Sequence, residues 1–316
     1  MSPSTMQGGI LVVDKPAGPT SFDVVERVRR AIGAAKAGHT GTLDPAATGV
    51  LVVCIDDAVK LQHWIMEGDK AYEALVVFGF ATDTEDAEGK ETERGDPAGL
   101  TTERVAAALA GFVGEIDQVP PMDSAVRVGG RRLHKAARAG ETVARVARRV
   151  QVHALDLVGF DPPTEGLALA RIAVRCGKGT YVRTIASALG AALGVPAHLG
   201  ALRRTATGPF SIGSALPLDE VERLGRLDRP NLVARMVTPA DALRAFPAVQ
   251  VAPEEVRALC QGKTLRREAP APLCRALDAD GALVAVVAPL AGGDGLKPVR
   301  VLVQPLEIPG PTPAKR

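Results

Sequence analysis

The sequence predicts an α+β chain with a small β-rich domain at its C-terminus. Helical and strand-like patterns are interspersed over residues 1–244, and from about Phe246 the pattern changes to short β-prone pieces around a turn. The chain has 316 residues, enough for two domains, and 46% of them are hydrophobic, enough to bury a core. We therefore expect a larger domain at 1–244, a smaller one at 245–308 and a disordered tail at 309–316.

The N-terminal elements follow a strand, helix, loop and strand order. Residues 9–13 form an apolar run typical of a short buried strand. Thr20 with Asp23 three residues later is typical of a capping box, and the apolar residues that follow recur at helical spacing, which predicts a helix over 21–33. Glycines and prolines then indicate a loop, and the apolar run at 50–55 predicts the next strand.

The later elements are predicted in the same way. Alternating or β-branched apolar residues indicate strands, and runs rich in Ala and Leu indicate helices. The expected strands are 71–78, 150–157 and 167–176, followed in the C-terminal domain by 249–251, 283–287 and 299–303. The expected helices are 102–112 and 180–193, and 217–245 is expected to mix helix and loop.

Composition and spacing disfavour several classes of protein. The longest apolar runs are far shorter than the ~18 residues of a membrane-spanning helix. The first residues lack the basic and apolar regions of a signal peptide, so we expect a cytoplasmic protein. The four cysteines and five histidines are scattered, without the paired spacing of a zinc site, so we expect reduced thiols and no metal. Aromatic residues make up only 3% of the chain, which disfavours a sheet of stacking rings for RNA.

Charge is distributed unevenly, although the net charge is only +2. Residues 126–150 carry eight basic side chains against one acidic side chain, a net charge of +7. Residues 81–103 carry eight acidic against two basic side chains, a net charge of −6, and we interpret this run as a solvated face. The basic run is rich in Arg, whose fork of donors suits phosphate. It is therefore either a solvated face too or a contact for nucleic acid.

The segment GHTGTLDPAATGVL at 38–51 is the most unusual in the chain. Asp44 precedes a proline, which restricts its backbone to an extended conformation, and nearby glycines let another chain approach closely. A carboxylate fixed in such a loop can act as a nucleophile or a base. The residues alone leave a second interpretation open, in which Asp44 only caps a turn.

This loop, preceded by ILVVDKPAGPTS, resembles that of the TruB-type tRNA pseudouridine synthases. Four other segments resemble motifs of the same family in the same order, so that the resemblance covers roughly residues 8–210. They are DKAYEALVVFG at 69–79, QVPPMDSAVRVGGRRLHKAARAG at 118–140, RCGKGTYVRTIASALG at 175–190 and AHLGALRRTATGPF at 197–210.

The resemblance implies the pseudouridine synthase fold, with a mixed, mostly antiparallel sheet, and a PUA-like domain at 245–308 that extends the contact with RNA. It implies an isomerase that converts uridine 55 in the T loop of tRNA into pseudouridine, with no cofactor and no metal. The basic run falls on the family's RNA-clamping insertion, at about 125–150 in this sequence. We expect a monomer that binds the T arm of tRNA and needs neither a protein partner nor a membrane.

The resemblance also assigns catalytic roles. Asp44 matches the catalytic carboxylate, and whether it attacks the sugar or removes a 2′ proton is left open. Arg183 matches a cation expected to pair with Asp44. Tyr72 matches the tyrosine that stacks on the flipped base and assists removal of its C5 proton, although ordinary core packing would use the same ring face.

Substrate-binding residues are implied in the same way. Tyr181 and Leu202 match the apolar lining of the pocket, and His39 matches the histidine that fills the space left by the extruded nucleotide. Lys15 and Pro16 match the family's first motif, whose expected role is to support the catalytic loop. Further candidates for contact with RNA are the basic residues Lys60, Arg127, Arg131 and Arg132.

Two residues depart from the family pattern. Asp123 stands where the family usually has an aromatic residue, and His134 stands where a tyrosine is more common. Asp123 removes a stacking surface and adds a negative charge, which weakens the case for an RNA contact there. Two other functions stay open: a guide-dependent synthase of the dyskerin type, and a non-catalytic RNA-binding protein or tRNA chaperone.

Overall fold

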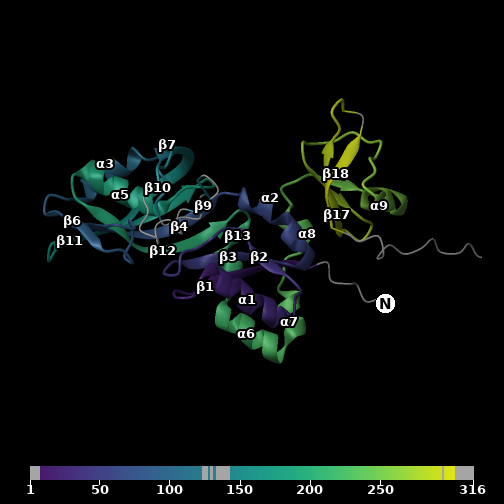
Figure 1. Cartoon of the computed structure of the whole chain (residues 1–316), viewed down its shortest axis with the longest axis horizontal. Coiled ribbons are helices and arrows are strands. Elements are labelled where there is room, and N and C mark those ends of the chain that lie inside the picture. Colours follow the sequence, from purple (N-terminus) through teal and green to yellow (C-terminus); the bar gives the residue numbers. More distant parts are fainter. Residues whose placement is uncertain (1–7, 123–126, 129–130, 133–142, 294, 303–316) are drawn as a thin grey trace, which may run out of the picture.

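The structure, a computed structural model, describes residues 8–122, 127–128, 131–132, 143–293 and 295–302, excluding the side chains of 127–128 and 131–132. Most of its strands join in one long sheet, and a smaller four-stranded sheet lies near the C-terminus (Figure 1). Among the described residues, no helix has both the length and the apolar character needed to cross a bilayer.

Ten strands form the main sheet. They are β1 (Gly9–Lys15), β2 (Ala37–His39), β3 (Thr48–Ile55), β4 (Lys70–Phe78), β7 (Gly114–Gln118), β10 (Arg148–Thr164), β11 (Leu167–Cys176), β12 (Ala197–Thr207), β13 (Phe210–Ser211) and β14 (Leu216–Pro217). The order across the sheet is β14-β1-β3-β12-β4-β11-β10-β7, with β2 paired to β3 and β13 to β12. Neighbours are antiparallel except β1 with β14 and β3 with β12. The predicted mixed, mostly antiparallel sheet is confirmed.

Helices cover both halves of this sheet (Figure 1). One apolar cluster joins β1 and β3 to their helices through residues such as Leu11, Val28 and Val221. A second cluster joins β4, β10 and β11 to theirs through residues such as Val76, Leu109 and Ile185. The first set of helices is α1 (Ser21–Ile32), α6 (Leu218–Leu227) and α7 (Arg229–Ala234), and the second is α3 (Thr102–Ala110) and α5 (Val182–Leu193).

Helix α1 begins and ends where its sequence predicts. Thr20 accepts a hydrogen bond from the Asp23 amide and the Asp23 carboxylate accepts one from the Thr20 amide, which confirms the capping box. The helix ends at Gly33, whose φ of 74° is the left-handed conformation typical of a helix C-terminus. Its first residue, Ser21, is buried and contacts the loop that carries Asp44.

The C-terminal strands form a separate sheet in the order β15-β16-β17-β18. Its elements are β15 (Ala248–Gln250), α9 (Pro253–Cys260), β16 (Cys274–Leu277), β17 (Leu283–Pro289) and β18 (Leu296–Val301). An apolar cluster shared with the main sheet, which includes Val52, Leu61 and Leu283, packs this domain against β3 and the residues after it. The predicted strand-rich C-terminal domain is therefore confirmed.

Shorter elements connect these units. After β3 the chain turns through two short helices, and an acidic hairpin follows β4. Two further strands pair within the basic insertion, and short turns of helix lead into the C-terminal domain. Their bounds are η1 (Asp56–Leu61), α2 (Gln62–Met66), β5 (Phe80–Thr82), β6 (Glu91–Arg94), β8 (Arg127–Val128), β9 (Arg131–Arg132), η2 (Ile212–Ser214) and α8 (Pro239–Ala242).

The structure differs from the sequence prediction mainly at the centre of the sheet. Strand β12 was not predicted, although it lies between β3 and β4. Its buried positions include Arg204 and Thr207 instead of an apolar series, so the alternation that marks a strand is missing. Strand β10 is 17 residues long, well beyond the predicted 150–157, and register shifts interrupt its pairing with β11.

Candidate active site

Asp44 lies in the loop between β2 and β3, and backbone contacts fix that loop. Ser21 Oγ donates to Leu43 O and accepts from the Leu43 amide, at 2.8 Å in each case. The Ala47 amide donates to Asp44 O at 3.1 Å, which closes a turn around Pro45. The Asp44 side chain remains 42% exposed, so a substrate can reach it.

Lys15, at the end of β1, is fully buried and binds the same loop. Its Nζ donates to Pro16 O and Pro45 O at 2.9 Å and to Ala47 O at 2.7 Å. Burial lowers the pKa of Lys15 to about 8, and the nearby charge of Asp44 works against that shift. The ammonium group is committed to backbone carbonyls, while the adjacent Pro16 is exposed. This geometry fits the predicted support of the loop.

Gly49 lets the strand after the loop approach β12 closely. Its φ is 99°, and a Cβ added there would lie 2.2 Å from Arg204 O. Gly49 is paired with Arg204 in the parallel register of β3 and β12. A larger residue would push the two strands apart and displace the loop that carries Asp44.

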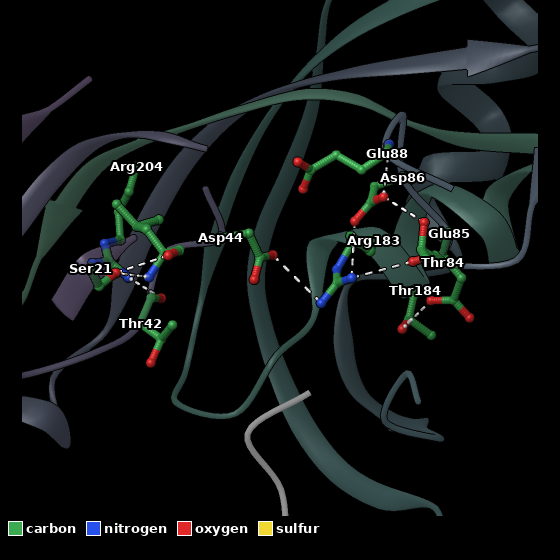
Figure 2. A network of polar contacts seen from close by, with 11 residues as sticks. Ser21, Thr42, Asp44, Thr84, Glu85, Asp86, Glu88, Arg183, Thr184 and Arg204 are labelled. Carbon is green, nitrogen blue, oxygen red and sulfur yellow. Dashed lines mark hydrogen bonds and ion pairs between the residues drawn. The ribbon is translucent and has the colours of Figure 1, made fainter. Parts of the chain in front are cut away.

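Arg183, in the first turn of α5, faces Asp44 from the other side (Figure 2). Its Nη2 lies 3.5 Å from Asp44 Oδ2, and its Nη1 lies 2.9 Å from Asp86 Oδ2 and donates to Thr84 O at 3.3 Å. Arg183 is only 5% exposed, so its charge acts in a largely dry environment. One buried guanidinium thus links the exposed carboxylate of Asp44 to a second carboxylate.

Asp86 corrects the interpretation of the acidic run as a solvated face. Its side chain is 14% exposed, and Thr84 Oγ1 donates to its Oδ1 at 2.6 Å while its other oxygen faces Arg183. The neighbouring Glu85 accepts a hydrogen bond from Thr184 Oγ1 at 2.9 Å, and burial raises the pKa of Glu85. Part of the run is therefore bound to α5, because the fold brings it beside a buried cation that lies 97 residues away.

Tyr72 and Arg204 are directly opposite each other on β4 and β12. Arg204 is 3% exposed and donates to Gly41 O at 3.0 Å, Thr42 O at 3.2 Å and Val50 O at 2.8 Å. Burial raises the pKa of the Tyr72 phenol, and the charge of Arg204 works against that rise. Sequence reasoning missed Arg204.

Tyr181 and Leu202 are both half-buried. Leu202 packs against the same apolar cluster as Tyr72. Tyr181 is the residue before α5, and Gln118 binds its backbone twice: Gln118 Oε1 accepts from the Tyr181 amide at 2.9 Å, and Nε2 donates to Tyr181 O at 3.2 Å. Gln118, which sequence reasoning also missed, therefore fixes the start of the helix that carries Arg183.

His39 and Lys60 make contacts within the protein. The His39 Nδ1 accepts from the Gly41 amide at 3.3 Å, and burial, followed by the charge of Arg204, lowers the pKa of this imidazole. Lys60 Nζ lies 2.9 Å from Asp57 Oδ1 and 3.5 Å from the carbonyl of Leu302. Lys60 thus joins the two domains, and the contacts of both residues with RNA stay predictions.

The predicted basic contacts of the insertion are described only by their backbones. Arg127 pairs with Arg132, and Val128 with Arg131, across β8 and β9. Asp123 and His134, the two departures from the family pattern, lie outside the described residues.

The site brings together a carboxylate, a cation and a phenol. Asp44 offers an exposed carboxylate beside a buried cation, and the Tyr72 phenol belongs to β4, which β12 separates from β3. Such a carboxylate can act as a nucleophile or as a general base. In the part of the chain that the structure describes, no three His, Cys, Asp or Glu side chains are grouped to hold a metal ion.

Comparison with known families matches three consecutive parts of the chain. Residues 29–182 match the TruB family pseudouridylate synthase N-terminal domain. Residues 183–244 match the tRNA pseudouridylate synthase B C-terminal domain, and residues 246–303 match the tRNA pseudouridine synthase II C-terminal domain.

Individual proteins that resemble this chain support the same family. A protein of Ralstonia nicotianae named tRNA pseudouridine synthase B is 42% identical over 301 residues, covering 93% of this chain and 94% of that protein. One of Symbiobacterium thermophilum with the same name is 49% identical over 243 residues, covering 77% and 78%. A chain in the crystal structure of a Cbf5-Nop10-Gar1 complex shares the fold, with a TM-score of 0.72 and 24% identity, covering 96% of this chain and 88% of that one. The family predicted from the motifs is confirmed, and this chain belongs to the TruB family of pseudouridylate synthases.

Proposed function

We propose that this enzyme isomerises uridine 55 in the T loop of tRNA to pseudouridine, as a monomer in the cytoplasm that uses neither a guide RNA nor a protein partner. Its relatives of 42–49% identity are named tRNA pseudouridine synthase B, which supports tRNA as the substrate. The observation that carries the proposal is the contact of 3.5 Å between the exposed carboxylate of Asp44 and the buried guanidinium of Arg183.

Asp44 is the catalytic carboxylate of this proposal. The N1–C1′ bond of the uridine breaks, the uracil turns, and a C5–C1′ bond forms, after which the proton on C5 is lost and N1 holds a proton instead. Asp44 acts either by attacking C1′ or by removing a 2′ proton. Arg183 keeps Asp44 charged in both cases, because a cation within ~4–6 Å favours the ionised carboxylate.

Tyr72, Tyr181 and Leu202 form the proposed base pocket. The ring of Tyr72 stacks on the turned uracil, and its hydroxyl assists the loss of the C5 proton. Tyr181 and Leu202 supply apolar walls, which strengthen the attraction between Asp44 and Arg183 by excluding water. Lys15 and Pro16 act indirectly, by holding the loop of Asp44 in place.

The remaining proposed contacts hold the RNA. His39 fills the space of the extruded nucleotide, and the basic residues of the insertion at about 125–150 neutralise backbone phosphates. We assign residues 1–244 to the catalytic domain and 245–308 to a PUA-like domain that extends the surface for tRNA. Lys60, which ties the two domains together, is a lesser candidate for phosphate contact.

The experiment is tritium release from a T-arm transcript labelled at uridine C5, with wild type and Asp44→Asn measured side by side. The amide has nearly the shape of the carboxylate but neither its charge nor its basicity, so release by wild type alone is expected. RNA affinity, measured separately, should survive in Asp44→Asn. No release by wild type that still binds RNA would favour the guide-dependent or the chaperone function.

A further inference from the structure

We propose that Arg204 is a positioning residue for the reaction, and that it holds the Asp44 loop and the Tyr72 hydroxyl in one fixed arrangement. The proposal rests on the proposed function, because Arg204 acts through Asp44 and Tyr72. It is carried by a single buried guanidinium that binds the backbone on both sides of Asp44 and belongs to the residue directly opposite Tyr72.

On one side, Arg204 gathers the two ends of the Asp44 loop. Its Nη2 donates to Gly41 O at 3.0 Å. Its Nη1 donates to Thr42 O at 3.2 Å (Figure 2), and both carbonyls precede Asp44 in the chain. Its Nε donates to Val50 O at 2.8 Å, which follows Asp44. The loop therefore closes around the guanidinium, and a displacement of Arg204 moves both ends of the segment that carries the carboxylate.

On the other side, Arg204 meets Tyr72. The two residues are opposite each other on antiparallel strands, where side chains on one face come within ~4.5–5.5 Å at Cβ. The positive charge of Arg204 therefore lies close to the Tyr72 phenol and works against the rise that burial causes in its pKa. The same side chain thus sets the position of the phenol and that of the Asp44 loop.

Arginine is suited to this arrangement by its shape. The planar guanidinium presents five N–H donors in a rigid fork, whereas the lysine ammonium is a single flexible point of charge. Arg204 uses its fork on three carbonyls, two in the loop before Asp44 and one on β3 after it. Burial lowers the pKa of Arg204, and Tyr72 and Asp44 work against that effect.

Arg203 provides a matched control. It is the preceding residue on β12, so its side chain leaves the opposite face of the sheet. Its Nη2 lies 2.7 Å from Asp14 Oδ2, and its side chain is 38% exposed. Its Nη1 also donates to Thr48 Oγ1, at the start of β3, at 3.4 Å. Arg203→Met therefore removes an arginine from the same strand while leaving the carbonyls of Gly41, Thr42 and Val50 with their partner.

The first test is a single-turnover assay of pseudouridine formation on T-arm RNA. We expect the rate constant to fall about 100-fold in Arg204→Met, because a reacting group displaced by ~1 Å costs that much. Arg204→Lys should lose less, since it keeps the charge, and Arg203→Met should stay near wild type. The Kd for the RNA should stay within about threefold, because a buried arginine adds no direct contact with RNA.

The second test measures whether Arg204 affects the surroundings of the Tyr72 ring. The chain has two tyrosines, so protein labelled with 3-fluorotyrosine gives two fluorine resonances, and Tyr181→Phe identifies that of Tyr72. In Arg204→Lys the Tyr72 resonance should shift while that of Tyr181 stays in place. Arg203→Met should shift neither. General loss of structure would broaden or move both, so this measurement separates positioning from folding.

Either of two results would overturn the proposal: single-turnover rates of Arg204→Lys and Arg204→Met equal to that of Arg203→Met, or a Tyr72 resonance that does not move. If Arg204→Met does not fold, Arg204→Lys decides both tests. A wild-type protein that forms no pseudouridine overturns the proposed function instead, and the fluorine measurement still tests the contact.

Discussion

Arg183 is shared by two carboxylates, and its two contacts differ in length. Asp86 is held at 2.9 Å and Asp44 at 3.5 Å, and Asp86 is the less exposed of the two. Asp86 is also fixed by Thr84 and so acts as the anchor of the guanidinium. Asp44 then keeps oxygen surface for the substrate while still lying beside the cation.

The first prediction concerns this anchor. Asp86→Asn keeps the shape of the side chain and removes its charge, so Arg183 loses its tighter ionic partner. We expect the single-turnover rate constant to fall about 10- to 100-fold, less than the roughly 100- to 1,000-fold lost when a preorganised group at the reacting atoms is removed, because Asp86 acts through Arg183. Glu93→Gln, an exposed change in the same acidic run, is the control. Equal rates for the two variants would contradict the role of Asp86.

Lys15 gives a second prediction, on pH. Its pKa is about 8 in the folded protein, and its ordinary value is 10.5. Above pH 8 the neutral amine has one proton fewer for the three loop carbonyls, so we expect an alkaline fall in single-turnover rate with an apparent pKa near 8. Lys15→Met should be slower and lack that fall. The same alkaline fall in Lys15→Met would assign it to another group.

The free energy of unfolding should change in the direction opposite to that of the rate: between pH 8 and 10.5 the contribution of Lys15 should increase. Between pH 8 and 10.5 the unfolded lysine keeps its proton while the folded one has lost it. The unfolded state then binds more protons, so the contribution of Lys15 to the free energy of unfolding becomes more favourable as pH rises. Denaturant titrations of wild type and Lys15→Met at several pH values check this sign.

Among the elements, α5 has an unusual start. It lacks a side chain of its own that caps the first turn, and Gln118 at the end of β7 binds the backbone of Tyr181 instead. The position of Arg183, two residues further on, is therefore set by a different strand. Local sequence patterns identify a cap only when it comes from the residues that start the helix. They cannot predict a cap supplied by a side chain from another element.

The third prediction follows from this contact. Gln118→Met has a similar length and removes both hydrogen bonds to Tyr181. We expect the single-turnover rate to fall about 10-fold, because the helix start and Arg183 shift together. Gln151→Met, on the paired strand β10, is the matched control, since the Gln151 side chain makes only a 3.4 Å contact with Val152 O. An equal loss in both variants would argue for a general effect on the sheet.

The elements differ in how far sequence could predict them. Helix α1 was predictable because its capping box and apolar spacing are local. The pairing of Asp44 with Arg183 was predictable because each lies in a continuous motif of the family. Strand β12 was not, because its buried arginine breaks the apolar alternation. Nothing local distinguishes Arg203 from Arg204: one faces Asp14 and the other the Asp44 loop, and only the pairing of β12 decides which.

At the scale of the whole molecule, the two domains share one apolar cluster. Trp64 and Phe246 meet edge to face, with ring centroids 6.4 Å apart, and the Arg275 guanidinium donates to the carbonyls of Phe246 and Ala240 at 2.8 Å. Lys60 adds its contact with Leu302. An interface built like a core favours unfolding of both domains in a single step.

The last prediction tests that cooperativity. Leu283, in the C-terminal domain, is 1% exposed within the shared cluster, so Leu283→Ala should lower the free energy of unfolding by about 2–5 kcal/mol. Trp64 is the single tryptophan and lies in the part of the chain that matches the TruB N-terminal domain, so its fluorescence reports unfolding there. If the domains unfold together, Leu283→Ala moves the denaturation midpoint seen by Trp64 and by circular dichroism equally, and the exposed change Val299→Ala moves neither. A Trp64 transition that stays in place while the dichroism splits into two steps would mean that the domains unfold independently.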